Sequence, residues 1–360
     1  MEKTKVAVIG AGFIADIHLE SYTRFVPDAQ VVAVYGRHIE RAEALVAKYH
    51  VGRPYDDLDR LLEECDPDVV DICVPNYLHY EVCLKAASKG KHVICEKPLA
   101  MTLEEADDMI RACEEAGVLL MYAEELCFAP KYERVRTMVN QGAVGDVYML
   151  KQGEKHDGPH SRWFYMKETA GGGVMMDMGC HALAWFRWMN PGVRVKAVYA
   201  DMKTVFHQDI TDSDDNVIAI VEFENGVTAI AETSWAKPGG MDDRIEVYGK
   251  KGVVYADLFR GNSALTYSTD GYGYAAEKAG STKGWTFTIF EEAFNQGYPQ
   301  ELAHFIDCVR TGKEPCVTGR DGREVLEIIY AAYESAGTGT KVSLPVQKQT
   351  IPYPMALWKK

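Results

Sequence analysis

Short apolar runs alternate with helix-like segments through the first third of the chain. The runs KVAVIG, QVVAVYG, VVDICV, KHVIC and VLLMYA are mostly apolar and rich in β-branched residues. Between them, residues 13–25, 80–89 and 103–116 repeat apolar positions at the spacing of a helix. Continuous apolar strands separated by helices indicate a parallel sheet that is covered on both faces. The pattern therefore predicts a doubly wound α/β domain up to residue 123.

The pattern changes in the second half of the chain. Longer runs alternate apolar and polar residues, and Asn225-Gly226 joins two of them in DNVIAIVEFENGVTAIAETSWA. An Asn-Gly pair between alternating runs is a strong hairpin signal, and DRIEVYGKKGVVYADLF repeats the arrangement. Helical spacing marks residues 174–189, 300–311 and 320–336. These features predict a second α/β domain with a large, mostly antiparallel open sheet.

Composition excludes several classes of partner. The chain has 360 residues and a net charge of −14, which argues against binding nucleic acid or an anionic membrane. It has no run of 18 apolar residues, and MEKTKVAVIG leaves no room for a signal peptide before the first strand. Nine cysteines without a CxxC pair are typical of reduced, mostly buried thiols. We therefore expect a cytoplasmic protein.

A glycine-rich loop lies between the first predicted strand and the first predicted helix. VIGAGFIA places Gly10, Gly12 and Ala15 there, where glycines let the backbone approach a pyrophosphate at the helix N-terminus. The strand, loop and helix are the context that this motif requires, so we predict binding of NAD or NADP. Gly36 and Arg37 stand where NAD-binding chains usually carry an acid. This pair leaves room for a 2′-phosphate, and both cofactors stay open.

Two polar stretches follow later strands of the predicted parallel sheet. The first contributes the loop residues Pro75, Asn76 and His79. The second, VICEKPLA, contributes Glu96 and Lys97, followed by Pro98, a candidate for a cis peptide bond. Ligands bind at the carboxyl ends of the strands in such sheets. A lysine at the exit of a buried strand is poorly explained by packing, so we predict that Lys97 acts in a ligand site.

Asp177 and His181 stand four residues apart in the apolar run GGGVMMDMGCHALAWFRW. Ionisable groups are rarely buried unless they are paired, and this spacing puts both on one face of a helix. A self-satisfied structural pair is one interpretation. Because the chain also carries Lys97 and a dinucleotide loop, we favour a catalytic set. In it His181 exchanges the proton of a hydroxyl, and Lys97 donates to the developing alkoxide. Asp177 either orients His181 or binds a neighbouring substrate hydroxyl.

A polar loop, GEKHDGPHSRWF at residues 153–164, has more polar groups than a fold needs, so we expect it to line the substrate pocket. Besides Asp177 and His181, the candidate substrate residues are Glu124, Lys155, His156 and Trp163. His156, Asp157 and His160 imitate a metal site, but an HxxxH pattern outside a helix is weak evidence, and we expect no metal.

These segments together resemble the Gfo/Idh/MocA family of sugar and inositol oxidoreductases, over residues 4–345. The resemblance implies a Rossmann domain, a C-terminal α/β domain whose open sheet commonly makes oligomer contacts, and a position for Lys97 beside nicotinamide and substrate. It also implies cofactor contacts from Gly10, Gly12, Phe13, Ile14, Pro75, Asn76, His79 and Trp163. The chain departs from the family at Cys127, where an arginine is common, and Glu124 and Glu125 lie nearby.

The expected organisation is a Rossmann domain at 1–123, a substrate and oligomerisation domain at 124–345, and an extended arm at 346–360. The expected activity is hydride transfer between NAD(P) and a ring secondary alcohol or ketone of a sugar, cyclitol or glycoside. A homo-oligomer, dimer or tetramer, is expected. Two alternatives stay open. One is a glycosidase that retains NAD and acts by transient oxidation and elimination. The other is a non-catalytic NAD(P)-binding sensor, which would not need Lys97, Asp177 and His181 together.

Overall fold

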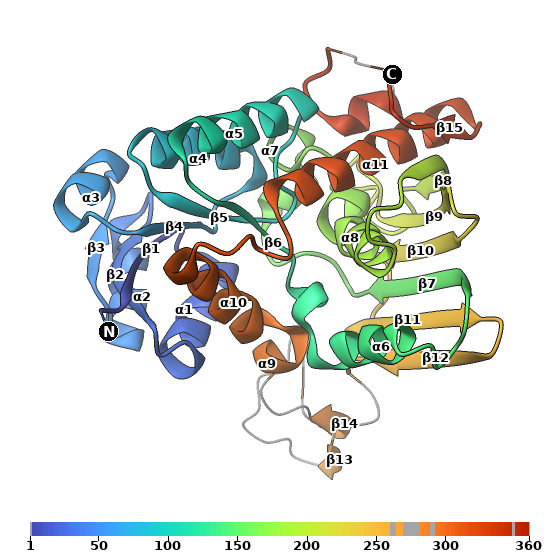
Figure 1. The fold of residues 1–360 in the computed structure, drawn as a ribbon, viewed down its shortest axis with the longest axis horizontal. Coiled ribbons are helices and arrows are strands. Elements are labelled where there is room, and N and C mark those ends of the chain that lie inside the picture. Colours follow the sequence, from blue (N-terminus) through green and yellow to red (C-terminus); the bar gives the residue numbers. More distant parts are fainter. Residues whose placement is uncertain are drawn as a thin grey trace. The chain divides into compact units, whose positions relative to one another are not determined.

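Six parallel strands, in the order β3-β2-β1-β4-β5-β6, form the sheet of the N-terminal part of the chain (Figure 1). The strands are β1 (Thr4–Ile9), β2 (Ala29–Tyr35), β3 (Arg53–Tyr55), β4 (Val69–Ile72), β5 (His92–Glu96) and β6 (Leu120–Ala123). This order is that of a dinucleotide-binding Rossmann sheet, which confirms the predicted doubly wound architecture. The short edge strand β3 was not predicted, because three residues that include a proline carry no apolar run.

The computed structural model describes residues 2–259, 264–268, 281, 283–288, 292–347 and 350–359. It divides into two compact units. The first comprises Met1–Phe128 and Gly297–Leu326, and the second comprises Ala129–Gln296 and Glu327–Lys360. Each unit is therefore discontinuous in sequence. The contiguous boundaries expected from the sequence, at residues 123 and 345, stay a prediction.

Helices cover the parallel sheet of the first unit. They are α1 (Phe13–Phe25), α2 (Ile39–Tyr49), α3 (Leu58–Cys65), α4 (His79–Ser88), α5 (Leu103–Ala116) and α10 (Tyr298–Thr311), with short turns at Asn76–Leu78 and Glu125–Phe128. Helix α5 begins after a capping box formed by Thr102 and Glu105, which satisfies its first backbone donors. Helix α10 packs against α1 within this unit (Figure 1). All four residues of β4 are buried, so the sheet interior is the core of the unit.

The second unit is built on a seven-stranded sheet in the order β12-β11-β7-β10-β9-β8-β15. Its strands are β7 (Val147–Lys155), β8 (Val195–Lys203), β9 (Asn216–Phe223), β10 (Thr228–Ser234), β11 (Asp242–Gly249), β12 (Gly252–Asp257) and β15 (Val342–Ser343). Strands β7 and β10 are parallel, and the other pairings are antiparallel. The predicted mostly antiparallel sheet is thus confirmed, as is the hairpin at Asn225-Gly226, where Gly226 has a φ of +87°.

Helices α6 (Pro130–Asn140) and α8 (Cys180–Met189) lie over one face of this sheet (Figure 1). Their rings meet at Tyr132 and Trp185, whose centroids are 6.3 Å apart. The opposite face is open and carries exposed apolar side chains from several strands. They are Tyr199, Ile218, Val253 and Tyr255. This alternation of buried and exposed positions follows from the two-residue period of a strand.

The remaining elements are α7 (Lys167–Ala170), the π-helical turn η4 (Met175–Gly179), α9 (Glu292–Gln296), α11 (Gly319–Thr338) and a two-stranded sheet of β13 (Ala264–Ser268) and β14 (Gly284–Thr288). Short turns lie at Arg162–Tyr165 and Pro354–Leu357. The predicted extended arm therefore contains a helical turn, in which Met355 and Leu357 are buried. All nine cysteines are free thiols, and seven of them are buried. No described helix has the length and apolarity to cross a membrane.

Candidate active site

The loop between β1 and α1 contains Gly10 and Gly12, and each position is a glycine for a different structural reason. A Cβ on Gly10 would lie 2.2 Å from the carbonyl oxygen of Cys73, and its φ is +137°, so the backbone itself requires glycine there. A Cβ on Gly12 would meet no atom within 4 Å. Gly12 is the N-cap of α1 and makes no side-chain cap bond. Open space at a helix N-terminus is what a pyrophosphate needs, so this loop fits a dinucleotide.

The structure also gives the positions of the other predicted cofactor residues near this loop. Phe13 is 45% exposed at the start of α1, and Ile14 follows it. Gly36 is buried, and a Cβ on it would come within 3.0 Å of the Ala11 side chain. Arg37 is exposed directly after it. The close approach of Gly36 to the glycine-rich loop explains why this position has no side chain.

Lys97 follows the last residue of β5 and is half-buried. Its backbone N–H donates a 3.0 Å hydrogen bond to Oε2 of Glu96. The Lys97-Pro98 peptide bond is cis, as the sequence suggested.

His79 links the loops that follow β4 and β5. Its Nδ1 lies 3.0 Å from the carbonyl oxygen of Pro98, and its Nε2 lies 2.9 Å from that of Val74. Burial lowers the pKa of His79, which favours the neutral ring and hence one N–H at a time. Asn76 is buried beside it on the turn after Pro75. Both ring nitrogens of His79 contact backbone carbonyl oxygens. Its predicted cofactor role would therefore be to hold the two loops in place, not to contact the cofactor with its ring nitrogens.

In the second unit, three consecutive glycines precede the segment that carries Asp177 and His181. Gly171 has a φ of +86° and ends α7. A Cβ on Gly172 would lie 2.1 Å from the Tyr333 hydroxyl, and one on Gly173 would lie 1.9 Å from the Asp214 carbonyl oxygen. Each glycine is therefore required for a separate geometric reason.

Asp214 anchors the start of this segment. Its carboxylate accepts hydrogen bonds from the backbone N–H groups of Gly173 and Met175, at 3.0 and 2.8 Å, and from the Tyr333 hydroxyl at 2.6 Å. Burial raises the pKa of Asp214, although the bonds from Tyr333, Met175 and Gly173 act in the opposite direction. The three donors are fixed in place by one buried carboxyl group.

Asp177 lies in the π-helical turn η4, and His181 lies on the following helix α8. The predicted helix over 174–189 is present, but its first part, Met175–Gly179, is π-helical, with i→i+5 bonding in place of the α-helical spacing. Both side chains are buried. Oδ2 of Asp177 accepts a 3.0 Å hydrogen bond from Nε1 of Trp235, which directly follows β10. Whether Asp177 orients His181 or binds substrate stays a prediction.

Trp235 belongs to a wall of rings that sequence reasoning missed. The Tyr165 ring lies 5.5 Å from that of Trp235, edge to face, and 5.3 Å from that of His207. His207 is buried with Nδ1 3.3 Å from Oδ2 of Asp215. Burial, and then the charges of Asp157, Asp177 and Asp215, raise the pKa of Tyr165. The wall therefore combines aromatic faces with an imidazole and a phenol beside Asp177.

The polar loop of residues 153–164 has some residues beside this wall of rings and others that pack locally. His156 is buried, and its Nδ1 accepts a 3.0 Å bond from the Gly158 N–H. A Cβ on Gly158 would lie 2.6 Å from the Tyr165 hydroxyl, so the loop runs directly past the wall. Trp163 is half-buried and stacks on Phe164, with centroids 3.7 Å apart. Among the described residues, His156, Asp157 and His160 do not form a metal-type cluster.

The two remaining predicted substrate residues are Lys155, the last residue of β7, and Glu124. Lys155 lies 2.9 Å from Glu232, which also pairs with Lys151 at 2.7 Å. Lys151 and Lys155 are four residues apart on β7, so they lie on the same face of the sheet. Together with Glu232 of β10 they occupy the open face, opposite α6 and α8. Glu124 is fully buried and belongs to the first unit. In that unit the neighbouring Glu125 accepts a 3.2 Å bond from the Tyr298 hydroxyl.

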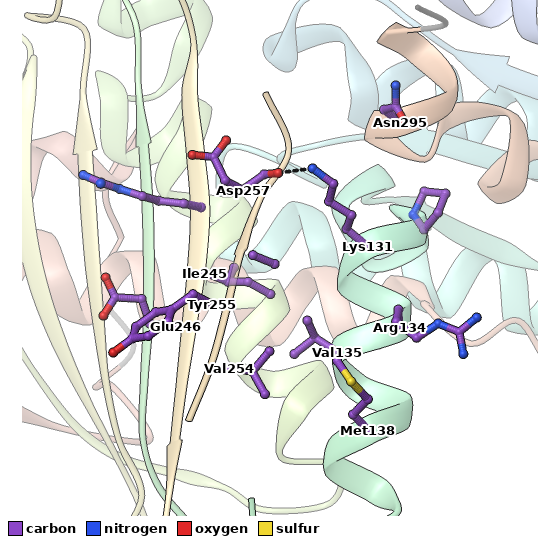
Figure 2. A pocket seen from close by; sticks show the side chains of 13 residues that line it. Lys131, Arg134, Val135, Met138, Ile245, Glu246, Val254, Tyr255, Asp257 and Asn295 are labelled. Atoms are coloured by element: carbon purple, nitrogen blue, oxygen red, sulfur yellow. Dashed lines mark hydrogen bonds between the residues drawn. The ribbon is translucent and has the colours of Figure 1, made fainter. Parts of the chain in front are cut away.

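A separate cavity of about 690 Å³ lies in the second unit between α6 and strands β11 and β12. Figure 2 shows Val135 and Met138 of α6 across from Ile245 and Val254, with Lys131 donating to the carbonyl oxygen of Asp257. None of the residues predicted to act in the site lines this cavity.

The chain matches two family models in succession. Residues 4–124 match the oxidoreductase family with an NAD-binding Rossmann fold, and residues 132–255 match the GFO/IDH/MocA C-terminal domain. The chain belongs to the Gfo/Idh/MocA oxidoreductase family. The predicted family, the NAD-binding Rossmann fold and the oxidoreductase class are thereby confirmed.

Similarity to individual Gfo/Idh/MocA proteins extends over nearly the whole chain. A myo-inositol 2-dehydrogenase of Thermotoga maritima is 28% identical over 94% of this chain and 98% of its own. A D-glucoside 3-dehydrogenase of Escherichia coli is 29% identical over 94% of this chain and 97% of its own. Among solved structures, GenD2 from gentamicin A biosynthesis, in complex with NAD, superposes with a TM-score of 0.90. It is 29% identical and the match covers 96% of this chain and 97% of GenD2.

Proposed function

We propose that this family member transfers a hydride between NAD and a ring secondary alcohol or ketone of a cyclitol, sugar or glycoside. The observation that carries the proposal is the pair of buried groups, Asp177 and His181, on a segment held by Asp214 and lined by aromatic rings. Aromatic faces suit the C–H surfaces of a sugar ring, and a carboxylate suits its hydroxyls. The relatives named for inositol and glucoside dehydrogenation support the same substrate class.

Each proposed role follows from the chemistry of the group. Bound NAD, held at the loop of Gly10 and Gly12, supplies the hydride acceptor. His181 takes the hydroxyl proton, because imidazole titrates near neutral pH. Lys97 donates a hydrogen bond to the oxygen on which negative charge develops. Asp177, held by Trp235, orients His181 or accepts from a neighbouring hydroxyl.

We propose NAD rather than NADP as the cofactor, supported by the description of the matching Rossmann family. Arg37 is exposed at the position where the adenine ribose would be recognised, and an arginine there suits the 2′-phosphate of NADP. Each activity assay must therefore be run with NADP as well as with NAD.

We also propose a cytoplasmic homo-oligomer. Its support is the open sheet face, on which Tyr199, Ile218 and Tyr255 are each exposed, and the nine free thiols. Light scattering during size-exclusion chromatography tests the oligomer. Masses of two or four chains are expected, and a monomer at all concentrations would contradict it.

The activity is tested with a panel of inositols, aldoses and alkyl glucosides, each with NAD and with NADP, by following absorbance of the reduced nicotinamide. Turnover with NAD and at least one compound is expected. His181→Ala should retain NAD binding and lose about 10²–10⁴ in kcat. Near-normal kcat in that variant would remove His181 from the mechanism, and release of an aglycone without net reduction of NAD would favour a glycosidase.

A further inference from the structure

His18 of α1 is completely buried in the first unit, with a carboxylate at each ring nitrogen. Its Nδ1 is hydrogen-bonded to Oδ2 of Asp71 in β4 at 2.9 Å. Its Nε2 lies 3.1 Å from Oε1 of Glu96, the last residue of β5. The ring therefore joins α1 to two strands at the edge of the sheet where ligands bind in this fold.

The positions of the two carboxylates specify the charge of the ring. A neutral imidazole carries one N–H, and its other nitrogen would present a lone pair to a carboxylate oxygen. An imidazolium carries a positive charge that lies 2.9 Å from the Asp71 carboxylate and 3.1 Å from the Glu96 carboxylate, although Nε2 and the Glu96 oxygen are not aligned for a hydrogen bond. Burial is the largest influence and would lower the pKa of His18, but the charge and hydrogen bond of Asp71, together with the contact with Cys73, outweigh it and raise the pKa well above the usual value. Burial would raise the pKa of Glu96, and the contact with His18 and the charge of Lys97 lower it instead.

Glu96 connects this ion cluster to Lys97. While Oε1 of Glu96 faces His18, its Oε2 accepts from the backbone N–H of Lys97 at 3.0 Å. We propose that His18 is a positioning residue for Lys97: an imidazolium held between Asp71 and Glu96 keeps the Glu96 carboxylate on the Lys97 backbone N–H. The inference rests on the proposed role of Lys97, and it adds to that role a reason for the direction of the lysine.

The groups around the cluster leave its charge balance intact. Cys73 Sγ lies 3.4 Å from Nδ1 of His18, and burial raises the pKa of this thiol, so it stays protonated. From α10, the Tyr298 ring lies 5.9 Å from that of His18. Burial and the charges of Glu125 and Glu96 raise the pKa of Glu301, also on α10. Tyr22 of α1 has a raised pKa through burial and the charge of Asp71. His18, Asp71 and Glu96 are then the charged members, with one net negative charge.

The protonation state is measured directly, without substrate or cofactor, by nitrogen NMR of the full chain labelled at its histidine rings. The signal that is missing from His18→Gln identifies His18. About one pH unit above the ordinary histidine pKa of 6.5, both His18 nitrogens should still carry protons. A ring with one unprotonated nitrogen at that pH would overturn the proposal. Because ligand atoms of His18, Asp71 and Cys73 lie within 4.8 Å of one another, a chelator-dependent His18 signal would overturn it too.

Single substitutions test the connection to Glu96. Asp71→Asn and Glu96→Gln should each lower the His18 titration midpoint by about one pH unit or more, as expected for loss of an opposite charge nearby. A midpoint that Glu96→Gln does not move would show that Glu96 does not share the charge of His18.

Kinetics test the effect on Lys97. His18→Gln should lower kcat about 10²-fold, the scale expected for a misplaced catalytic group, with KM for NAD nearly unchanged. His92→Gln is the matched control, because His92 begins β5 and accepts a 3.1 Å bond from the Leu119 N–H. It should keep wild-type kcat. Equal losses in both variants would overturn the positioning role. If the wild type turns over no compound of the panel, the proposed function fails while the NMR result for His18 still stands.

Discussion

Trp235 Nε1 donates a 3.0 Å hydrogen bond to Oδ2 of Asp177, which joins the end of β10 to the π-helical turn. This bond fixes one oxygen of the acid that the proposed mechanism uses. It also places the aromatic wall of Trp235 and Tyr165 beside that acid.

Trp235→Phe keeps the aromatic face and removes the donor. Because a hydrogen bond to a charged group contributes about 1.5–3 kcal/mol, kcat/KM should fall about 10- to 100-fold. The dissociation constant of NAD, measured by fluorescence titration, should not change. Wild-type kcat/KM in this variant would show that the bond does not position Asp177 for turnover.

Gly12→Ala and Gly10→Ala separate a cofactor role from a folding role. A Cβ on Gly12 meets no atom of the chain within 4 Å, so the melting temperature should stay at the wild-type value. NAD affinity should fall about tenfold or more, equivalent to ~1.4 kcal/mol. Gly10→Ala places a Cβ 2.2 Å from the Cys73 carbonyl oxygen and should lower the melting temperature. Unchanged NAD affinity in Gly12→Ala would argue against the pyrophosphate loop.

Gly173→Ala should destabilise the second unit, because its Cβ would lie 1.9 Å from the Asp214 carbonyl oxygen. Overpacking of this kind costs about 1–3 kcal/mol, and kcat should fall with it since the anchored segment carries Asp177 and His181. Gly153→Ala in β7 is the matched control, with its nearest atom 3.9 Å away. Thermal melting and turnover of both variants are compared. Equal stability of the two would show that the approach of Gly173 to Asp214 is unimportant.

Glu301→Gln should stabilise the chain increasingly as pH rises. Glu301 is fully buried, and burial followed by the charges of Glu125 and Glu96 raises its pKa well above 4.5. The folded chain therefore holds a proton that the unfolded chain releases near pH 4.3, and wild-type stability falls as pH rises from there to the folded-state pKa. Glutamine does not titrate, so it does not lose this stability.

Melting temperatures of Glu301→Gln and wild type are compared from about pH 5 to about pH 8, above the unfolded-state pKa of about 4.3 from which the linkage begins. Glu81→Gln on the exposed side of α4 controls for the substitution itself. A difference between Glu301→Gln and wild type that does not vary with pH would contradict the assignment of a protonated Glu301.

The fold was largely predictable because apolar periodicity reports burial directly. Five of the six parallel strands, the Asn225-Gly226 hairpin and the helix at 103–116 follow from it. The π-helical turn did not follow, because five residues are too few to distinguish its period from that of an α-helix. The placement of Lys155 on the open sheet face required the register of β7, which the pattern of a single loop does not contain.

The site was predictable only where its residues lie in short motifs. Gly12, Lys97 and Asp177 stand in such motifs, whereas their supports come from distant segments. Asp214 and Tyr333 are 119 residues apart and meet in one hydrogen bond. Trp235 reaches Asp177 over 58 residues. A single sequence carries no signal for such pairs, and only the position of Trp235 directly after a strand is visible in it.

Hydride transfer itself is tested most directly by isotope. A cyclitol or glycoside that the panel identifies is prepared with deuterium on its ring carbinol carbons and incubated with the chain and NAD. The reduced cofactor is then analysed by mass spectrometry. The account predicts one deuterium in the nicotinamide ring of each reduced cofactor molecule. Reduced cofactor that carries no deuterium would contradict the account. So would the absence of reduced cofactor with every compound of the panel.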